Sequence, residues 1–168
     1  MGEEATLVII KPHGLKKSLT GNILSRLSET KLKIIGAKVM QVGVELAEKH
    51  YHHLKNMPFF PELQNYIRGQ LHGENRVMAL IYAGEGAIAK VRGIAGATNP
   101  EEADPVSVRG AYGRILTTGL FENVVHASSS EEEAKREIQL WFEPDEIIDD
   151  LYPSQEGEVV CSARRVWK

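Results

Sequence analysis

The sequence of 168 residues is poor in cysteine and in long apolar runs. Its single cysteine, Cys161, cannot form an internal disulfide, which is typical of a protein in a reducing compartment. No apolar stretch approaches the roughly 20 residues that span a bilayer. The start is acidic, with Glu3 and Glu4, where a secretory signal would be basic. We therefore predict a soluble, cytoplasmic protein without a membrane partner.

The chain also lacks an excess of positive charge, because 20 basic residues face 23 acidic ones and the net charge is -3. This balance excludes a general attraction to nucleic acid, so any polyanion must be held by a local cluster of cations. An apolar fraction of 42% is ordinary for a globular protein. The length predicts a single domain over residues 1–168. Pro144, Pro153 and Gly157 predict a C-terminal tail at 143–168.

Two familiar kinds of site are poorly supported by the residues. The segment from Gly14 to Ser18 lacks the glycine spacing that cradles phosphates, which excludes a P-loop nucleotide kinase. His50 and His53 are three residues apart and would share a helix face, as metal ligands often do. No nearby cysteine or pair of acids completes a zinc site, so metal binding here stays a minor alternative.

The apolar periodicity alternates between strands and helices. Runs rich in β-branched residues predict strands at 5–10, 33–44, 76–82 and 123–127. Helical spacing follows Thr20 and is predicted again at 45–54, 60–69, 86–95 and 130–142, whereas 99–112 is predicted as a loop. This order predicts an α/β (α+β) sandwich of the ferredoxin-like βαββαβ type, with an antiparallel four-stranded sheet and added helices.

His126 lies at the end of the last predicted strand, directly before a helix whose start is rich in hydroxyls and acids. An ordinary imidazole has a pKa near ~6.5, so much of it is neutral at cellular pH and can act as a nucleophile. A buried structural histidine is the commoner explanation of a lone histidine among apolar residues. Other motifs must therefore decide its role.

Seven short motifs give that decision, because their order and spacing resemble those of nucleoside diphosphate kinases over roughly residues 5–150. The motifs are Lys11-Pro12, His50-Tyr51, Pro58-Phe59-Phe60, Gly96-Ala97-Thr98-Asn99-Pro100, Ser107-Val108-Arg109-Gly110, Asn123-Val124-Val125-His126 and Leu140-Trp141-Phe142.

The resemblance implies a nucleoside diphosphate kinase that transfers the γ-phosphate of a nucleoside triphosphate, typically ATP, to a nucleoside diphosphate. The reaction would follow a ping-pong mechanism through phosphohistidine at His126. Glu137 matches the glutamate that orients the imidazole, and Ser128 keeps a supporting hydroxyl. Lys11 and Tyr51 match residues beside the transferring phosphoryl group.

The resemblance also implies a nucleotide site in which cations face the phosphates, since charge on the phosphate oxygens is stabilised by positive groups placed in advance. Phe59 would stack on the base, an interaction that any base can make. We expect Phe59 to be partly exposed and Phe60 to belong to the core. The matching nucleotide-binding residues are Lys11, Phe59, Arg92, Thr98, Arg109 and Asn123. Mg²⁺ is expected to arrive on the nucleotide phosphates without a dedicated protein cage.

Members of the family form dimers that build into tetramers or hexamers, so a homo-oligomer is expected here. The chain departs from the family pattern at His13, Ala127 and Ser129, and it carries insertions at 69–76 and 110–122. Ser129 removes a carboxylate, and the second insertion lies in a loop that shapes the nucleotide site. These departures leave one alternative, a catalytically weakened nucleotide-binding or scaffold protein of the same fold.

Overall fold

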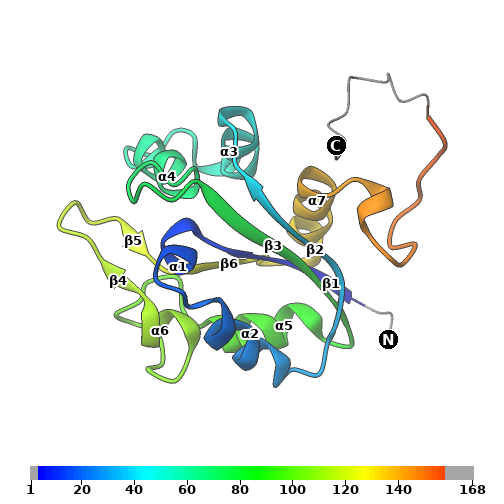
Figure 1. Ribbon diagram of the computed structural model, residues 1–168, viewed down its shortest axis with the longest axis horizontal. Helices are drawn as coiled ribbons and strands as arrows, with labels where there is room; N and C mark the ends of the chain where they lie inside the picture. Colours follow the sequence, from blue (N-terminus) through cyan, green and yellow to red (C-terminus); the bar gives the residue numbers. More distant parts are fainter. Residues whose placement is uncertain (1–3, 158–168) are drawn as a thin grey trace, which may run out of the picture.

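A computed structural model describes residues 4–157, and its centre is a four-stranded sheet (Figure 1). The strands lie in the order β2-β3-β1-β6, and every neighbouring pair is antiparallel. Their bounds are Glu4–Ile10 for β1, Lys33–Gln41 for β2, Arg76–Gly84 for β3 and Val125–Ala127 for β6. The predicted ferredoxin-like fold is confirmed.

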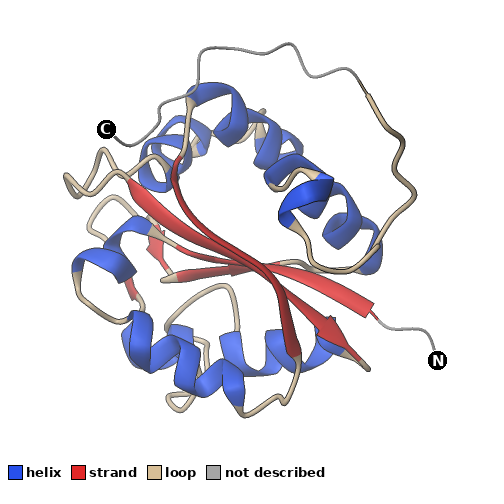
Figure 2. Ribbon diagram, turned by 45° about the vertical axis from the view of Figure 1, so that its right-hand side comes forward, coloured by secondary structure: helices blue, strands red, loops and turns tan. Residues whose placement is uncertain are grey.

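Helices cover both faces of this sheet (Figure 2). One layer contains α3 (Val44–His50), α4 (Phe60–Ile67) and α7 (Glu131–Trp141). The other contains α2 (Thr20–Ser28), α5 (Ala87–Ala95) and α6 (Val108–Tyr112), while α1 (Pro12–Lys16) follows β1 directly. Two short 3-10 turns, His52–Leu54 and Pro144–Glu146, complete the described helical segments.

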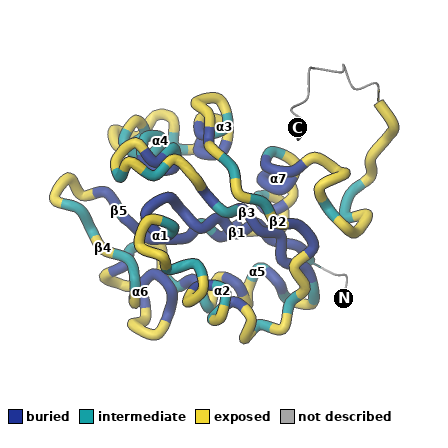
Figure 3. The backbone as a smooth tube through the Cα atoms, in the orientation of Figure 1, coloured by how far each residue is buried: buried dark blue, intermediate teal, exposed yellow. Residues whose placement is uncertain are grey.

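The core lies in two halves, one on each side of β1. This explains why β1 is buried from Ala5 to Ile10 (Figure 3). Leu7 and Ile9 belong to the half beneath α7, whereas Val8 and Ile10 belong to the half beneath α5. Alternate side chains of a strand point to opposite faces, so a strand covered on both sides buries side chains at every position and is mostly apolar. Because β1 is buried along nearly all of its length, the position of the residues that follow Ile10 is fixed.

Several predicted boundaries were wrong. The predicted loop at 99–112 contains α6, whose first turn is capped by the Ser107 hydroxyl accepting from the Gly110 amide at 3.2 Å. The strand predicted to reach residue 44 ends at Gln41, because Val44 begins α3. The last strand starts at residue 125 and not at 123, since Val124 has a φ of 67° and cannot continue a strand.

The insertion at 110–122 forms a second, two-stranded sheet that was not predicted, made of β4 (Arg114–Ile115) and β5 (Phe121–Glu122). In the tail, Ile147, Leu151 and Tyr152 pack against the core. Cys161 lies outside the described residues. Within residues 4–157, no helix is long and apolar enough to cross a membrane.

Candidate functional site

A cleft of about 760 Å³ opens where β1 and β6 meet the inserted β4–β5 hairpin, defined here as residues 114–122. Nine of the ten site residues predicted from the sequence line it; the tenth, Ser128, is buried behind its wall. The nine are Lys11, Tyr51, Phe59, Arg92, Thr98, Arg109, Asn123, His126 and Glu137. They come from both ends of the chain and from both helical layers, so the fold itself brings them together.

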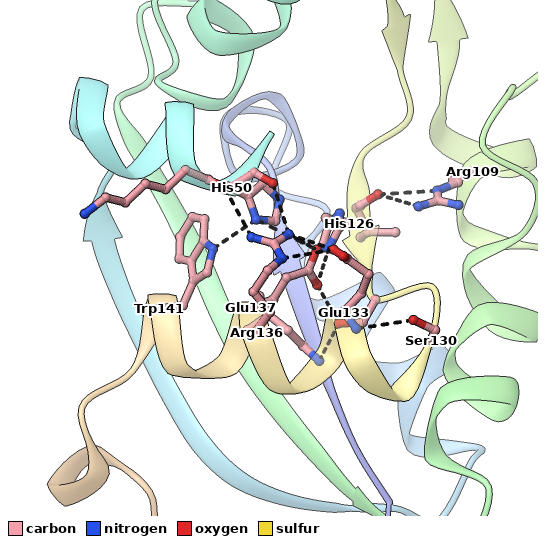
Figure 4. Close-up of polar contacts among 12 residues, drawn as sticks. His50, Arg109, His126, Ser130, Glu133, Arg136, Glu137 and Trp141 are labelled. Atoms are coloured by element: carbon pink, nitrogen blue, oxygen red, sulfur yellow. Dashed lines mark hydrogen bonds and ion pairs between the residues drawn. The ribbon is translucent and has the colours of Figure 1, made fainter. Parts of the chain in front are cut away.

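His126 is held by one carboxylate on the neighbouring helix (Figure 4). Its Nε2 lies 2.8 Å from Glu137 Oε2, and the Ser128 hydroxyl donates to the same oxygen at 2.6 Å. Ser128 is fixed in turn by the Leu7 amide, which donates to its Oγ at 3.1 Å. A carboxylate only accepts hydrogen bonds, so Glu137 selects the tautomer of His126 with the proton on Nε2. The lone pair of Nδ1 is then free.

Exposure differs sharply between these two side chains. The imidazole of His126 is 18% exposed and lines the cleft, whereas Glu137 is only 3% exposed. A solute in the cleft therefore reaches the ring more readily than the carboxylate that holds it. This is the arrangement that an oriented nucleophile needs.

A second histidine, His50, packs against the first, with ring centroids 4.5 Å apart in an edge-on arrangement. The Trp141 Nε1–H donates to His50 Nδ1 at 3.1 Å, so the proton of His50 is on Nε2. Burial lowers the pKa of His50 well below its usual range, and the nearby His126 lowers it further. His50 is thus neutral, and although its Nδ1 lies 3.9 Å from Glu137 Oε1, it carries no proton to donate there.

Three cations line the same cleft. The Lys11 ammonium donates to Asn123 Oδ1 at 2.7 Å, and the Asn123 amide donates to the Thr98 carbonyl at 3.0 Å. The Arg109 guanidinium donates to the carbonyls of Val125, at 3.1 Å from Nη2, and Gly96, at 2.8 Å. Arg92 is more exposed and completes the group. Backbone carbonyls hold Arg109 without neutralising its charge.

Burial and the crowding of like charges lower the pKa values of two of these cations. Burial, and then the charge of Arg109, lower the pKa of Lys11 to about 7. Burial, and then the charge of Arg92, lower the pKa of Arg109 to about 10. An anion bound beside Lys11 and Arg109 would raise both pKa values again, because an opposite charge favours the protonated forms.

The aromatic residues of the cleft occupy distinct environments. Tyr51 is buried, and burial raises the pKa of its hydroxyl, followed by the effect of the Glu137 charge. Phe59 is 42% exposed at the cleft mouth, while Phe60 is half-buried against the core, as predicted for this pair. A large exposed aromatic surface inside a cleft is suited to stacking on a planar group.

The zinc alternative finds no support in the histidine segment, since α3 ends at His50 and turns that residue inward while His52 and His53 are exposed. In the described part of the chain, one group has donor atoms close enough to hold an ion, namely His50, His126 and Glu137, within 4.8 Å of one another. Both ring nitrogens nearest the carboxylate already make hydrogen bonds. A metal there would have to displace both bonds.

Sequence reasoning missed several residues of the cleft. Glu62 follows Phe59 by three positions, so helical spacing alone would have placed it on the same side. Glu133 lines the cleft one turn before Glu137 on α7, by the same rule. No such spacing pointed to the hairpin residues, because no helix or strand was predicted within the insertion that carries them. These residues are Thr118, Gly119, Leu120 and Phe121.

Comparison with known proteins gives a consistent picture. The family profile described as nucleoside diphosphate kinase matches residues 4–147. The nucleoside diphosphate kinase of Pyrococcus furiosus is 44% identical over 146 residues, covering 87% of each chain. That of Staphylococcus epidermidis is 41% identical over 153 residues, covering 91% of this chain and 97% of the other.

Two solved structures extend the comparison to bound nucleotides. A halophilic nucleoside diphosphate kinase from Halobacterium salinarum in complex with CDP superposes with a TM-score of 0.79 at 37% identity, covering 88% of this chain and 93% of the other. A transition-state mimic of the Borrelia burgdorferi enzyme with vanadate and ADP superposes with a TM-score of 0.78 at 31% identity. It covers 90% of this chain and 93% of the other.

Proposed function

The chain belongs to the nucleoside diphosphate kinase family, an enzyme family that transfers a phosphoryl group between nucleotides, and we propose that His126 is the residue that carries this group. The observation that supports the assignment best is the contact of 2.8 Å between His126 Nε2 and Glu137. It leaves one ring nitrogen free, on the side of a cleft lined by Lys11, Arg92 and Arg109.

In the first half of the reaction, Nδ1 of His126 attacks the terminal phosphorus of a triphosphate. A nitrogen–phosphorus bond forms, the bond to the bridging oxygen breaks, and the diphosphate leaves with that electron pair. No proton has to leave the nucleophile, because Glu137 keeps the ring proton on Nε2. In the second half a different diphosphate attacks the phosphohistidine in the same cleft, which gives ping-pong kinetics.

The cations stabilise the charge of the transferring group. Arg109 and Arg92 would face the phosphates together with Thr98, and Lys11 with Asn123 would reach the sugar and the transferring group. Because backbone carbonyls hold Arg109 before any nucleotide binds, little reorganisation is needed when charge develops. Tyr51 closes the inner wall, and Phe59 offers its face to the base.

Members of the family act with a divalent cation, and we infer that it is Mg²⁺ carried by the nucleotide phosphates. Ser129 and Glu133 line the cleft on the His126 side, and their oxygens suit a hard ion that keeps most of its waters. When bound, the ion would neutralise charge on the phosphate oxygens. The residues of the chain would contact it through water and not as a closed cage.

Assembly and location also stay proposals. We infer a dimer-based homo-oligomer, a tetramer or hexamer, since β2 is an edge strand with exposed Ile34 and Val39. Sedimentation velocity would give the mass, and a monomer would contradict this inference. The single-domain organisation and the cytoplasmic location likewise remain predictions.

A steady-state experiment tests the proposed reaction. Initial rates with ATP varied at several fixed concentrations of a diphosphate should give parallel double-reciprocal lines in the native protein and no transfer in His126→Ala. Intersecting lines would mean that both nucleotides bind together, and they would contradict a phosphohistidine intermediate. Calorimetric binding of ADP to His126→Ala shows that the variant keeps its cleft.

A further inference from the structure

The hairpin of the second insertion forms one wall of the cleft, through Thr118, Gly119, Leu120 and Phe121. The tip of the β4–β5 hairpin is a tight turn, in which the Gly119 amide donates to the Leu116 carbonyl at 2.8 Å. Its base is fixed by buried Glu122, which pairs with Arg114 and lies with its Oε1 2.7 Å from Nε2 of His72, a residue of the other insertion. The hairpin is therefore braced on the body and presents a defined edge to the cleft.

That edge is joined to α4, the helix that begins directly after Phe59. The Thr118 hydroxyl donates to Glu62 Oε1 at 2.6 Å, across 56 residues of sequence. Figure 1 shows α4 and the hairpin at the same end of the molecule. Glu62 stands three residues after Phe59, in the first turn of α4, and both side chains line the cleft. A flat group stacked on Phe59 would meet this carboxylate at its edge.

The carboxylate of Glu62 favours bases whose edge offers hydrogen-bond donors. In the described part of the chain Glu62 makes no salt bridge, and its bond to Thr118 uses one oxygen. A carboxylate accepts hydrogen bonds but donates none. Guanine offers two adjacent donors, adenine and cytosine offer one amino group, and uracil offers a single imide proton between two carbonyl oxygens that repel a negative charge.

We propose that Glu62, positioned by Thr118, is a base-selecting residue of the nucleotide site and favours guanine over uracil. This inference rests on the proposed function, because it places the base on Phe59. The preference of the site for adenine and cytosine is expected to lie between its preferences for guanine and uracil. The site is half-exposed, so the preference is modest, about tenfold between guanine and uracil nucleotides, at the lower end for a hydrogen bond to a charged group.

The test compares kcat/KM for GDP and UDP as acceptors from ATP in three proteins. The native protein should favour GDP by about tenfold. In Glu62→Gln the amide oxygen still accepts from Thr118, but the amino group now faces the base, so the ratio should fall to about one or below. The control Glu48→Gln makes the same change at an exposed position of α3, outside the cleft, and should keep the native ratio.

Two results would overturn the proposal: a native ratio near one, or a native ratio that persists in Glu62→Gln. If the proposed function is wrong, the native protein will form no phosphoenzyme with ATP, and this result is independent of the GDP-to-UDP ratio. In that case, calorimetric binding of GDP and UDP to the native protein and to Glu62→Gln gives the same comparison without turnover. Thr118→Val should lower the ratio in either assay, because it frees the carboxylate from its fixed position.

Discussion

Replacing Glu137 by glutamine gives the sharpest view of how the nucleophile is prepared. The carboxylate accepts from His126 Nε2 at 2.8 Å and from the Ser128 hydroxyl at 2.6 Å, both through Oε2. An amide has one accepting oxygen and no charge, so the glutamine side chain would satisfy these donors less well, and its amino group favours the wrong tautomer of the ring.

The expected loss follows from the burial of this contact. Glu137 is 3% exposed, so its hydrogen bonds are little screened by water. A hydrogen bond to a charged group contributes ~1.5–3 kcal/mol, which corresponds to a rate of phosphorylation lower by about tenfold to 150-fold. Nucleotide affinity should change little, because the carboxylate lies behind the ring and away from the cations.

Rapid-quench labelling with γ-labelled ATP measures this rate in a single turnover. Glu132→Gln is the matched control, since it makes the same substitution on an exposed position of α7. It should label at the native rate. If Glu137→Gln also labelled at the native rate while its thermal unfolding was unchanged, the carboxylate would have no part in preparing His126.

Three further predictions concern other parts of the cleft. Nucleotide binding at pH 8 should take up protons, because the pKa of Lys11 is lowered to about 7 in the free protein and bound phosphates restore its charge; calorimetry in two buffers of different ionisation enthalpy measures the uptake. Trp141→Phe should slow phosphorylation severalfold at unchanged nucleotide KM, because His50 Nδ1 can then carry a proton and compete for Glu137. Phe59→Ala should weaken nucleotide binding by roughly 1–3 kcal/mol while kcat changes little.

Each of these predictions has its own contradicting outcome. Proton uptake in Lys11→Gln equal to that of the native protein would place the titrating group elsewhere. A raised KM with native kcat in Trp141→Phe would indicate a binding role for Trp141 and not the control of a tautomer. Native affinity in Phe59→Ala would remove the base from this ring.

The sequence predicted the parts of the fold that periodicity encodes. The largely apolar run at 5–10 predicted a strand buried on both faces, which is β1, and helical spacing predicted the long amphipathic α7. Short elements escaped: α6 has five residues and depends on a cap at Ser107, and β4–β5 consists of two-residue strands held by side-chain contacts. Such elements exist because of tertiary contacts, which a local pattern does not contain.

The candidate site residues were predicted from motifs, which do not contain the side-chain contacts between residues that the structure shows. Ser128 was expected to support the proposed nucleophile directly, whereas its hydroxyl donates to Glu137. His50 was weighed as a metal ligand, whereas its contacts with Trp141 and His126 give it a neutral packing role. A partner 91 residues away cannot be inferred from spacing.

Identification of the phosphorylated residue is the most direct test of the account. The native protein, incubated with γ-labelled ATP and freed of nucleotide, should carry a label that is stable in base, labile in acid and located at His126 by fragment mass spectrometry. Adding a diphosphate should discharge it as labelled triphosphate. A label on any other residue, or one that persists in His126→Ala, would contradict the central claim.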